Sequence, residues 1–449
     1  MANYETLTWI ANGCLSRFKN NTTMVGKVNR DTDDEFGRKG RKIGNVFYFR
    51  RSPQYLSISS TTNAGQAVTF SNYEYTEPDS IPIYVGSGGT GTAGTNLTVP
   101  IMMYEQDQLL KFDDVDTRIN KPVAEQLATD ADRLVTGLYK FVANYVGTPG
   151  VPLTGGSAYK AFLQAKAILN KLGAPKENRF VIFDPDLEVE LADYLKQFQN
   201  PAGKISEVFN TGTLTEAAGM RWAMSQDLQL HTTGAVTTQM TSKGGNNTAG
   251  TIYGGINASG SAAVVPVGNT STFNLAAGAG TLTAGDIIQF VGSNAVNLRT
   301  KQSLGYLRPY AVTTAQGTVA AAASVVVSPS IETAYVSSSS SATDNPYMNM
   351  SSTGITTGTN MLAWGGATTT AKTAMQNLVF CPDAFAFANV KLPLFDGLHM
   401  AARATDPDTG LSLRVSQAWN IDNTQLKTRM DMAVGVAGLE VDQAVRVLS

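Results

Sequence analysis

A glycine-rich run is the first stretch of the sequence whose residue types suggest chemistry. Residues 86–95 read GSGGTGTAGT, with five glycines, three threonines, one serine and one alanine. Glycine-rich loops bind phosphate when they end in G-K-[ST], or when G-x-G-x-x-G joins a strand to a helix. This run meets neither condition, because no lysine follows it and strand-like residues flank it on both sides (IPIYV and LTVPIMM). We therefore expect a flexible loop tip rather than a phosphate site.

The histidines and cysteines are the next candidates for metal or nucleophile chemistry. The chain has two of each, at His231, His399, Cys14 and Cys381. Neither H-x-x-x-H nor C-x-x-C occurs, so a zinc site is not predicted. No G-x-S-x-G elbow is present to supply a serine nucleophile. We expect surface or hydrogen-bonded histidines and two free thiols, and we predict no catalytic residue, no metal and no cofactor.

Two acidic clusters and one aromatic cluster complete the search for chemistry. DPDTG at 406–410 resembles half of a calcium loop but lacks the later glutamate of an EF-hand, so we expect a turn between strands. DTDDE at 31–35 is expected to be a solvated charge run. The aromatic residues 47–49 could stack on bases. Beside Arg50 and Arg51 in a strand, they are expected instead to pack against a neighbour.

The composition points to a cytoplasmically made protein with packed, uncharged surfaces. Of the 449 residues, 43% are apolar and only 16% are charged, against about 25% charged residues in typical soluble domains. The formal net charge is −2, and no basic block is longer than RKGRK, so sequence-specific DNA binding is not predicted. We find no signal peptide, and no apolar run approaches the 18 residues of a membrane span.

The first quarter of the chain predicts an arm and a projecting hairpin. Residues 1–42 contain one short amphipathic piece followed by charged sequence, and read as a mobile arm. Residues 43–112 carry strand-like runs such as VFYFRR and YLSIS. Four prolines in this segment argue against the interior of a regular sheet. The segment therefore predicts a long two-stranded hairpin that leaves the body and returns, with the glycine run near its far end.

Helical periodicity dominates the next part of the sequence. Apolar residues recur at intervals of three and four across residues 119–146, which predicts a helix roughly 40 Å long. Pro122 fits its first turn, and Gly147 with Pro149 is expected to end it. Residues 157–198 predict a helix closed by Gly173, the short strand RFVIF and a second helix.

The remaining sequence predicts an inserted β-domain and a return to the first domain. Between residues 235 and 375 charge is nearly absent, and STFNL, GDIIQFVG, YLRPYAVTT and ASVVVSP read as short strands of a barrel or sandwich. Near the end, residues 426–436 alternate between apolar and polar side chains, which predicts a half-buried strand. The fold class is therefore α+β, with an all-β domain inserted into another domain.

The predicted hairpin has a consequence for assembly. Two-stranded hairpins are marginally stable alone in water, and one as long as 43–112 needs a partner surface. Another copy of the same chain can supply that surface. The candidate residues of this hairpin for contact between subunits are Phe47, Phe49, Arg50, Arg51, Tyr73, Glu74 and Glu77.

This order of elements resembles the major capsid proteins of tailed phages, the Hong Kong 97 fold. The resemblance is carried by KAFLQAKAILNKLGAPKENRFVIFDPDLEVEL and by the closing SLRVSQAWNIDNTQLKTRMDMAVGVAGLEVDQAVRVL. It implies a division of the chain into seven segments. These are an N-arm (1–42), an E-loop (43–112), the spine helix with the first part of a peripheral domain (113–156), the first part of an axial domain (157–234), an inserted β-domain (235–375), the axial return (376–405) and the peripheral strands (406–449).

Two stretches are similar to coat proteins of short-tailed phages that carry an insertion domain. They are GDIIQFVGSNAVNLRTKQSLGYLRPYAVTT and NLVFCPDAFAFANVKLP. Some members of the wider fold crosslink an E-loop lysine to an asparagine of a neighbour. Here no lysine lies between Lys42 and Lys111, so that chemistry is not expected and the shell should be held together non-covalently. The resemblance also makes Arg299 and Lys301, in the inserted stretch, candidates for charged contacts between subunits. A solvated loop is an equally good interpretation of these two residues.

The resemblance implies a mechanical function. Many copies would form hexamers and pentamers of an icosahedral shell, assembled in the host cytoplasm with a scaffolding protein and a portal protein. The shell would enclose double-stranded DNA without sequence-specific binding and without a membrane. Two alternatives remain open, an encapsulin-like bacterial compartment and a secreted β-rich surface protein; an enzyme is not expected.

Overall fold

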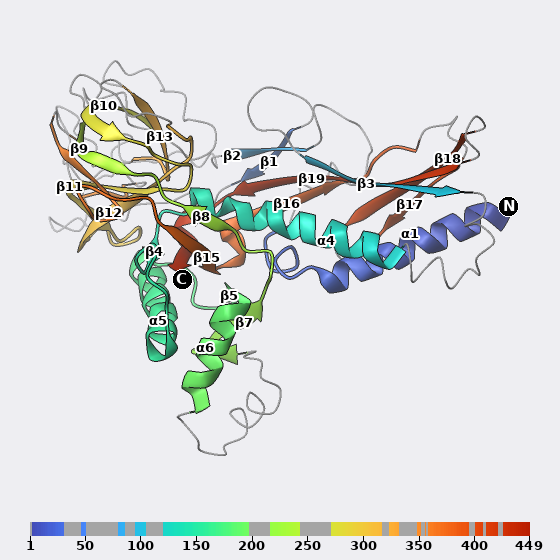
Figure 1. Cartoon of the computed structure of the whole chain (residues 1–449), viewed down its shortest axis with the longest axis horizontal. Helices are drawn as coiled ribbons and strands as arrows, with labels where there is room; N and C mark the ends of the chain where they lie inside the picture. The colour runs from blue at the N-terminus through green and yellow to red at the C-terminus, as the bar shows by residue number, and fades with distance from the viewer. Residues whose placement is uncertain are drawn as a thin grey trace, which may run out of the picture.

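The protein combines two extended sheets, a closed barrel and a two-stranded ribbon with a few helices (Figure 1). The computed structural model describes residues 2–30, 46–50, 80–85, 95–104, 120–196, 216–242, 271–316, 323–331, 348–351, 355, 358–394, 400–406, 410–420 and 425–449. The helices are α1 (Ala2–Asn21), α4 (Lys121–Thr136), α5 (Gly155–Leu172) and α6 (Pro185–Lys196), with 3-10 turns η4 (Gly137–Phe141), η5 (Pro382–Ala384) and η6 (Val441–Gln443). The predicted α+β class is confirmed.

The strands follow one another along the chain with few helices between them. In the first half they are β1 (Val46–Arg50), β2 (Ser80–Tyr84), β3 (Thr95–Tyr104), β4 (Tyr145–Val146), β5 (Phe180–Phe183), β6 (Glu216–Ala217), β7 (Met220–Met224), β8 (Leu230–Thr232) and β9 (Val236–Ser242). In the second half they are β10 (Ser271–Gly280), β11 (Ile287–Val296), β12 (Ser303–Val312), β13 (Ser324–Ser328), β14 (Asn360–Ala363), β15 (Thr373–Phe380), β16 (Phe385–Val390), β17 (Met400–Thr405), β18 (Ser412–Asn420), β19 (Gln425–Gly438) and β20 (Ala444–Leu448).

The long sheet, formed by β3, β16, β17, β18 and β19, is antiparallel and centred on β19. β3 pairs along one side of β19, β18 and β16 pair in succession along its other side, and β17 pairs with β18. Side chains alternate between the two faces of a strand. The alternation predicted for 426–436 is confirmed, because Met430, Met432 and Val434 all lie in the core beneath the sheet.

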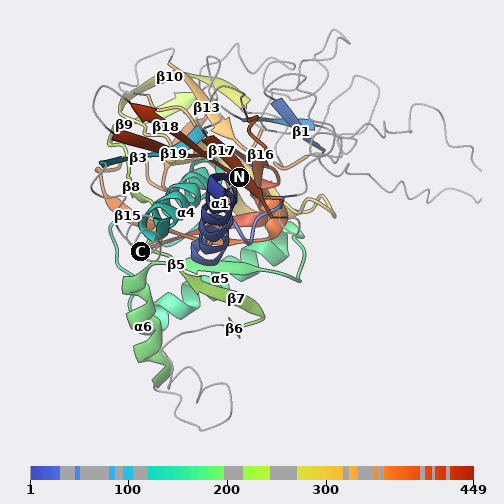
Figure 2. The same ribbon diagram turned by 90° about the vertical axis from the view of Figure 1, so that its right-hand side faces the viewer.

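The N-terminal helix packs against this sheet, so the predicted mobile arm is wrong for residues 2–30. α1 lies beside α4 on one face of the long sheet (Figure 2). Its buried face is Ala11, Cys14, Leu15 and Phe18. Just after the helix, the Asp132 carboxylate of α4 accepts the backbone N–H groups of Thr23 at 2.6 Å and of Met24 and Val25 at 3.0 Å. Residues 31–42 lie outside the described residues.

The predicted single hairpin over 43–112 is also wrong in its described parts. β1 and β2 do form an antiparallel pair, but β3 joins β19 of its own chain instead. The reason is the alternation in β3, whose residues Leu97, Val99 and Ile101 face the same core as β19. The strand order also places the glycine run, whose residues 86–94 are not described, between β2 and β3 rather than in the connection from β1 to β2.

The helix predicted over 119–146 is shorter in the structure. α4 begins with Pro122 in its first turn, as predicted, but ends at Thr136 and continues as the 3-10 turn η4. Tyr145 and Val146 instead pair in parallel with β20. Apolar spacing alone did not reveal this change, because Leu138 and Tyr139 are buried in the 3-10 turn as they would be in a continued helix.

The central sheet has the order β4-β20-β15-β5-β7-β6, and β8 also pairs with β15. The predicted helix, strand and helix are confirmed as α5, β5 and α6. Phe162, Ala165 and Leu169 are fully buried on the predicted face of α5. Gly173 ends the helix with φ of 81°, which glycine adopts without strain. The N-cap is Thr154, with Ser157 completing a capping box at the third position.

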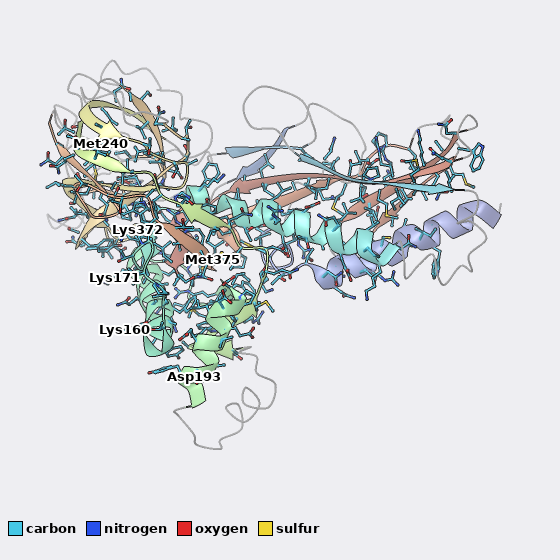
Figure 3. All side chains as sticks on the ribbon, in the orientation of Figure 1. Lys160, Lys171, Asp193, Met240, Lys372 and Met375 are labelled. Carbon is cyan, nitrogen blue, oxygen red and sulfur yellow. The ribbon has the colours of Figure 1, made fainter. Side chains whose placement is uncertain are left out.

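A closed barrel occupies one end of the molecule, with the strand order β10-β13-β12-β11-β14-β9 (Figure 1). The four strands predicted between residues 271 and 328 are all present. Its interior is filled by apolar side chains, among them Met240, Phe290, Tyr310 and Val325. Met240 is labelled inside the barrel in Figure 3. The chain enters the barrel from β8 and leaves it into β15, which are paired in the central region.

Candidate functional site at the joint between barrel and body

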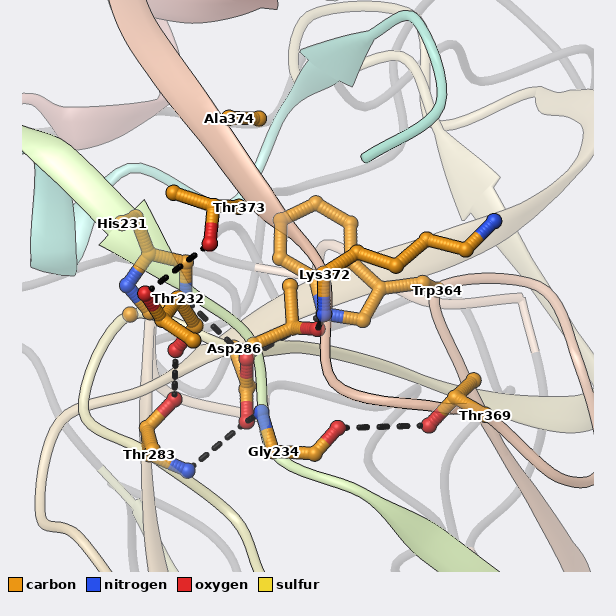
Figure 4. Close-up of polar contacts among 12 residues, drawn as sticks. His231, Thr232, Gly234, Thr283, Asp286, Trp364, Thr369, Lys372, Thr373 and Ala374 are labelled. Carbon is orange, nitrogen blue, oxygen red and sulfur yellow. Dashed lines mark hydrogen bonds and ion pairs between the residues drawn. The ribbon is translucent and has the colours of Figure 1, made fainter. Parts of the chain in front are cut away.

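Five side chains meet where the barrel contacts the rest of the protein, here called the body. This joint cluster consists of Tyr139, His231, Asp286, Trp364 and Arg446. η4, β8 and β20 of the body supply Tyr139, His231 and Arg446. Asp286 immediately precedes β11, and Trp364 immediately follows β14 of the barrel. Figure 4 shows His231, Asp286 and Trp364 converging between the two parts.

His231 of the body forms two side-chain hydrogen bonds, one to Asp286 of the barrel and one to Tyr139 within the body. Its Nε2 lies 3.0 Å from Asp286 Oδ1, and its Nδ1 lies 3.2 Å from the Tyr139 hydroxyl. The imidazole is 4% exposed and the carboxylate 1%. The expectation of a satisfied histidine is therefore confirmed for His231, whereas His399 lies outside the described residues.

Asp286 is held by a set of donors that favours its charged form. Burial opposes ionisation, but hydrogen bonds from His231 and from the backbone N–H groups of Thr283 and Gly234 outweigh it. The pKa of Asp286 is therefore below its ordinary value. The indole N–H of Trp364 also donates to this carboxylate at 3.2 Å. Hydrogen bonds to a charged acceptor are stronger than those between neutral groups. The Asp286 carboxylate therefore stabilises the arrangement in which these donors surround it.

Arg446 is fully buried next to the carboxylate and between aromatic rings. Its Nη1 donates to the Gly285 carbonyl at 2.8 Å and lies 3.3 Å from Gln376 Oε1. The guanidinium lies over the rings of Tyr139 and Trp364, at 5.7 and 5.5 Å from their centroids. Burial lowers the pKa of Arg446 to about 10, partly offset by the nearby tyrosines and Asp286. Cation–π contacts gain strength when a cation is desolvated in this way.

Three further contacts tie the barrel to the body. Arg308 of β12 is fully buried and forms an ion pair with Asp442 of η6. The Ser328 hydroxyl donates to the Phe141 carbonyl at 3.0 Å. The Asn297 side-chain amide donates to the Lys171 carbonyl at 2.7 Å, and Figure 3 shows Lys171 at the end of α5 nearest the barrel. The barrel is therefore attached at several separate points.

The joint cluster is built for attachment rather than for catalysis. A histidine hydrogen-bonded to a carboxylate can activate a nucleophile when a substrate can reach it. Here both side chains are buried, and the second imidazole nitrogen contacts a buried tyrosine hydroxyl. Gly285 packs so closely that an added Cβ would lie 2.9 Å from the Tyr139 ring, leaving no space for a substrate.

A cleft of about 490 Å³ lies beside this joint, between α5 and the barrel. It is lined by Asn144, Tyr145, Val146, Gly147, Gln164, Ala167, Ile168, Lys171, Gln289, Tyr306, Leu307 and Pro309.

Among the described residues, no group of three or more histidine, cysteine, aspartate or glutamate side chains is arranged to hold a metal ion. The helices that the structure describes also include none with the length and apolar character of a membrane span.

The other sequence candidates fall in different places. Asp406 of DPDTG forms an ion pair with Lys19 at 2.9 Å. The Gly410 N–H donates to the Asp406 carbonyl at 3.0 Å, consistent with the predicted turn between β17 and β18, and residues 407–409 lie outside the described residues. Cys14 and Cys381 are both buried thiols, as predicted. Burial raises the pKa of the Cys381 thiol.

The candidate contact residues are only partly described. Arg299 is exposed, and Lys301 reaches toward the Met348 carbonyl at 3.4 Å, in the turn between β11 and β12. Phe47, Phe49 and Arg50 lie on β1, whose side chains are outside the described set, as are Arg51, Tyr73, Glu74 and Glu77. Their role between subunits stays a prediction.

Sequence reasoning missed Asp286 and Arg446. Both stand within patterns that read as ordinary strands, GDIIQF and AVRVL. One available signal was an arginine in an otherwise apolar strand, since a buried arginine needs partners.

Comparison with known proteins identifies the family. The sequence model of the P22 coat protein, gene protein 5, matches residues 86–444 of the 449-residue chain. The chain belongs to the P22 coat protein family. The chain is therefore a tailed-phage major capsid protein, and the encapsulin alternative is not favoured. No match was found among curated proteins.

Solved structures similar to this chain include phage proteins and a coat-protein domain. A chain from Mycobacterium phage Che8 is 10% identical, with a TM-score of 0.44 over 95% of this chain and 90% of that one. The mature capsid of bacteriophage PhiM1 is 11% identical, with a TM-score of 0.41 over 95% and 86%. The CUS-3 coat protein I-domain is 18% identical and covers 30% of this chain and 96% of its own, with a TM-score of 0.17. These scores are low, so the assignment rests on the family match.

Proposed function

We propose that this coat protein forms the hexamers and pentamers of an icosahedral shell that encloses double-stranded DNA. The family match over residues 86–444 carries this proposal. Two surface features agree with it: a long sheet with one face on which no helix of the described residues packs, and a β1–β2 ribbon against that face. Assembly in the host cytoplasm with a scaffolding protein and a portal protein is part of the proposal, as is a structural, non-enzymatic role.

The barrel is proposed to be the insertion domain of this shell protein. It lies between β8 and β15, which pair with each other, so the main fold closes beneath it. The joint cluster and the Arg308–Asp442 ion pair would keep the barrel fixed to the body while subunits move. Subunit contacts are proposed to be non-covalent, since no lysine lies between Lys42 and Lys111. Connection 51–79 is proposed to lie on an adjacent subunit.

The test is expression of the full chain alone and with candidate scaffolding genes, followed by electron microscopy and sedimentation. Closed shells of uniform diameter are the expected result. They should dissociate into intact chains in denaturant without reductant, because no crosslink is expected. A monodisperse monomer under every condition, including with scaffold, would contradict the proposed function.

A further inference from the structure

The cleft between α5 and the barrel has polar groups that no described contact within the chain satisfies. It measures about 490 Å³, which is within the range of about 300–1,000 Å³ found for small-molecule sites, and such sites often lie between domains. Two of its lining residues, Asn144 and Tyr306, each contain a buried side-chain oxygen without a hydrogen-bond partner among the described residues. Buried polar atoms are nearly always paired in folded proteins. Unpaired oxygens beside a cleft of this size therefore indicate a ligand that supplies their partners.

Asn144 supplies a fixed hydrogen-bond acceptor. Its Nδ2 donates to the carbonyls of Asp442 at 3.3 Å and of Ala444 at 3.2 Å. Because a carbonyl only accepts, the reverse orientation of the side-chain amide would place oxygen against oxygen. The atom left without a partner is therefore Oδ1, in a residue that is only 1% exposed. A ligand must carry an N–H or O–H donor to satisfy it.

The backbone of β4 adds a donor and a second acceptor, where α5 meets the barrel (Figure 1). β4 is the end strand of the central sheet, and Asn144, Tyr145, Val146 and Gly147 all line the cleft. In the parallel pairing with β20, the Arg446 N–H donates to the Asn144 carbonyl at 2.8 Å. One residue of a parallel pair bonds to the two residues that flank its partner, so the N–H and C=O of Tyr145 point away from β20. They form a strand edge in the cleft wall that no described strand pairs with.

The rest of the lining suits a flat ligand with a negative charge. Of the described residues that line the cleft, Lys171 alone carries a charge, and its Nζ lies 5.8 Å from the centroid of the Tyr306 ring. Burial raises the pKa of the Tyr306 hydroxyl, so it stays protonated at neutral pH and can donate a hydrogen bond. Ile168 of α5 forms an apolar wall on one side, and Leu307 and Pro309 of β12 form one on the other.

We propose that this cleft binds a nucleotide through one edge of its base and through its phosphate. Enzymes that act on bases recognise them by hydrogen bonds to the Watson–Crick edge and by packing the flat ring between aromatic or apolar side chains. Here the Tyr145 N–H and C=O would pair with that edge, Asn144 Oδ1 would accept a base N–H, and Lys171 would contact the phosphate. The nucleotide can be free or can end an unpaired strand, since both carry the same groups. Binding of this kind does not require shell formation, so its test is separate from that of the proposed function.

Two other occupants would use fewer of these groups. Inorganic phosphate would contact Lys171 but would leave the apolar walls and the Tyr145 backbone unused. An extended peptide would pair with Tyr145, but β4 spans only Tyr145–Val146, and a peptide without an acidic group leaves Lys171 without an anion. Both occupants therefore serve as competitors in the test.

Calorimetric titration of the full chain with dAMP, dGMP, dCMP and dTMP tests the proposal. At least one of them should bind, and its nucleoside and deoxyribose 5-phosphate should each bind about tenfold or more weakly, because each lacks half of the contacts. The proposal is wrong if no nucleotide binds with a Kd below about 1 mM. It is also wrong if inorganic phosphate or a capped dialanine peptide binds as tightly as the best nucleotide. A 5′-phosphorylated single strand that binds as tightly as that nucleotide would identify a strand end as the source, and weaker binding would identify the free nucleotide.

Two substitutions on α5 locate the ligand in the cleft. Ala167→Trp should fill the cleft and abolish binding, whereas Lys171→Glu should weaken nucleotide binding about tenfold and leave nucleoside binding unchanged. The matched controls are Leu163→Trp and Lys160→Glu, at exposed positions of the same helix that do not line the cleft (Figure 3). Circular dichroism should show that all four variants are folded. Equal weakening by Lys160→Glu and Lys171→Glu, or normal binding by Ala167→Trp, would overturn the proposal, whereas nucleotide binding by a wild-type chain that never forms shells would count against the proposed function alone.

Discussion

At the residue scale, two buried carboxylates, Asp286 and Asp132, have pKa values shifted in opposite directions. Burial disfavours the charged form of Asp286, but its donors outweigh that effect and leave its pKa below the ordinary value. Burial also raises the pKa of Asp132, and there the backbone donors Thr23, Val25 and Met24 offset it only in part. The two carboxylates therefore contribute to the pH dependence of stability with opposite signs.

Asp286 should stabilise the fold except in strong acid. Because its folded pKa is below 3.8, its contribution is complete above that value and is lost as the pH falls through the folded pKa. Asp286→Asn should lower the free energy of unfolding at pH 7 by about 2–3 kcal/mol, since it disrupts a buried, donor-rich site. It should also reduce the loss of stability between neutral and acid pH. Urea unfolding at pH 7 and pH 3 measures both effects, with exposed Glu177→Gln as control; equal results for the two variants would contradict this role.

Asp132 should hold the N-terminal helix to the body. Asp132→Ala removes the acceptor of three backbone N–H groups and should cost about 3 kcal/mol. Hydrogen exchange should then rise across residues 2–30 before it rises elsewhere. Because the folded pKa is raised, wild-type stability declines as the pH increases from 3.8 through that pKa, and the variant should lack this decline. Asp130→Ala, on the half-buried side of α4, is the control, and unchanged exchange in Asp132→Ala would exclude the proposed attachment.

At the element scale, sequence patterns predicted elements whose boundaries depend on local residues. α5 was predictable because its apolar stripe ends at a glycine that adopts the left-handed conformation. The extent of α4 was not, because Tyr145 and Val146 have the spacing of a helix but pair with β20, more than 290 residues later in the chain. The pairing of β3 with β19 was missed for the same reason, since no local signal reports a distant partner strand.

Two glycines differ in how their backbone conformation tolerates a side chain: Gly137, directly after α4, and Gly147, directly after β4. Gly137 has helical φ and ψ, and an added Cβ would contact nothing within 4 Å. Gly137→Ala should therefore stabilise the protein by about 0.5–1 kcal/mol through helix propensity. Gly147→Ala should destabilise it instead, because φ is +101° and the new Cβ would lie 2.9 Å from the Leu448 carbonyl oxygen. Thermal unfolding distinguishes the two, and a destabilised Gly137→Ala would mean that the 3-10 turn requires glycine.

At the scale of the whole molecule, the sequence predicted the β-domain but not the contacts that attach it to the body. The low-charge region with four short strands predicted an all-β unit, and a closed barrel is present. The polar groups that fix the barrel could not be predicted, because Tyr139, His231 and Arg446 come from three distant segments that meet only in the fold.

The several attachments between barrel and body predict a single cooperative unfolding transition for the wild type. Asp442→Ala tests this, because it leaves the Arg308 guanidinium fully buried without its carboxylate. Removing one partner of a buried ion pair costs about 3–5 kcal/mol. The substitution should therefore weaken the contact between barrel and body and leave the apolar core of each intact. Calorimetry should therefore show two transitions in the variant, with the joint opening before the rest unfolds, and fluorescence of Trp364 should follow the first. Asp193→Ala, on exposed α6 far from the joint (Figure 3), is the control. One transition at a lower temperature in Asp442→Ala would show that barrel and body share their stability through the remaining contacts, and that Arg308 and Asp442 do not control the attachment.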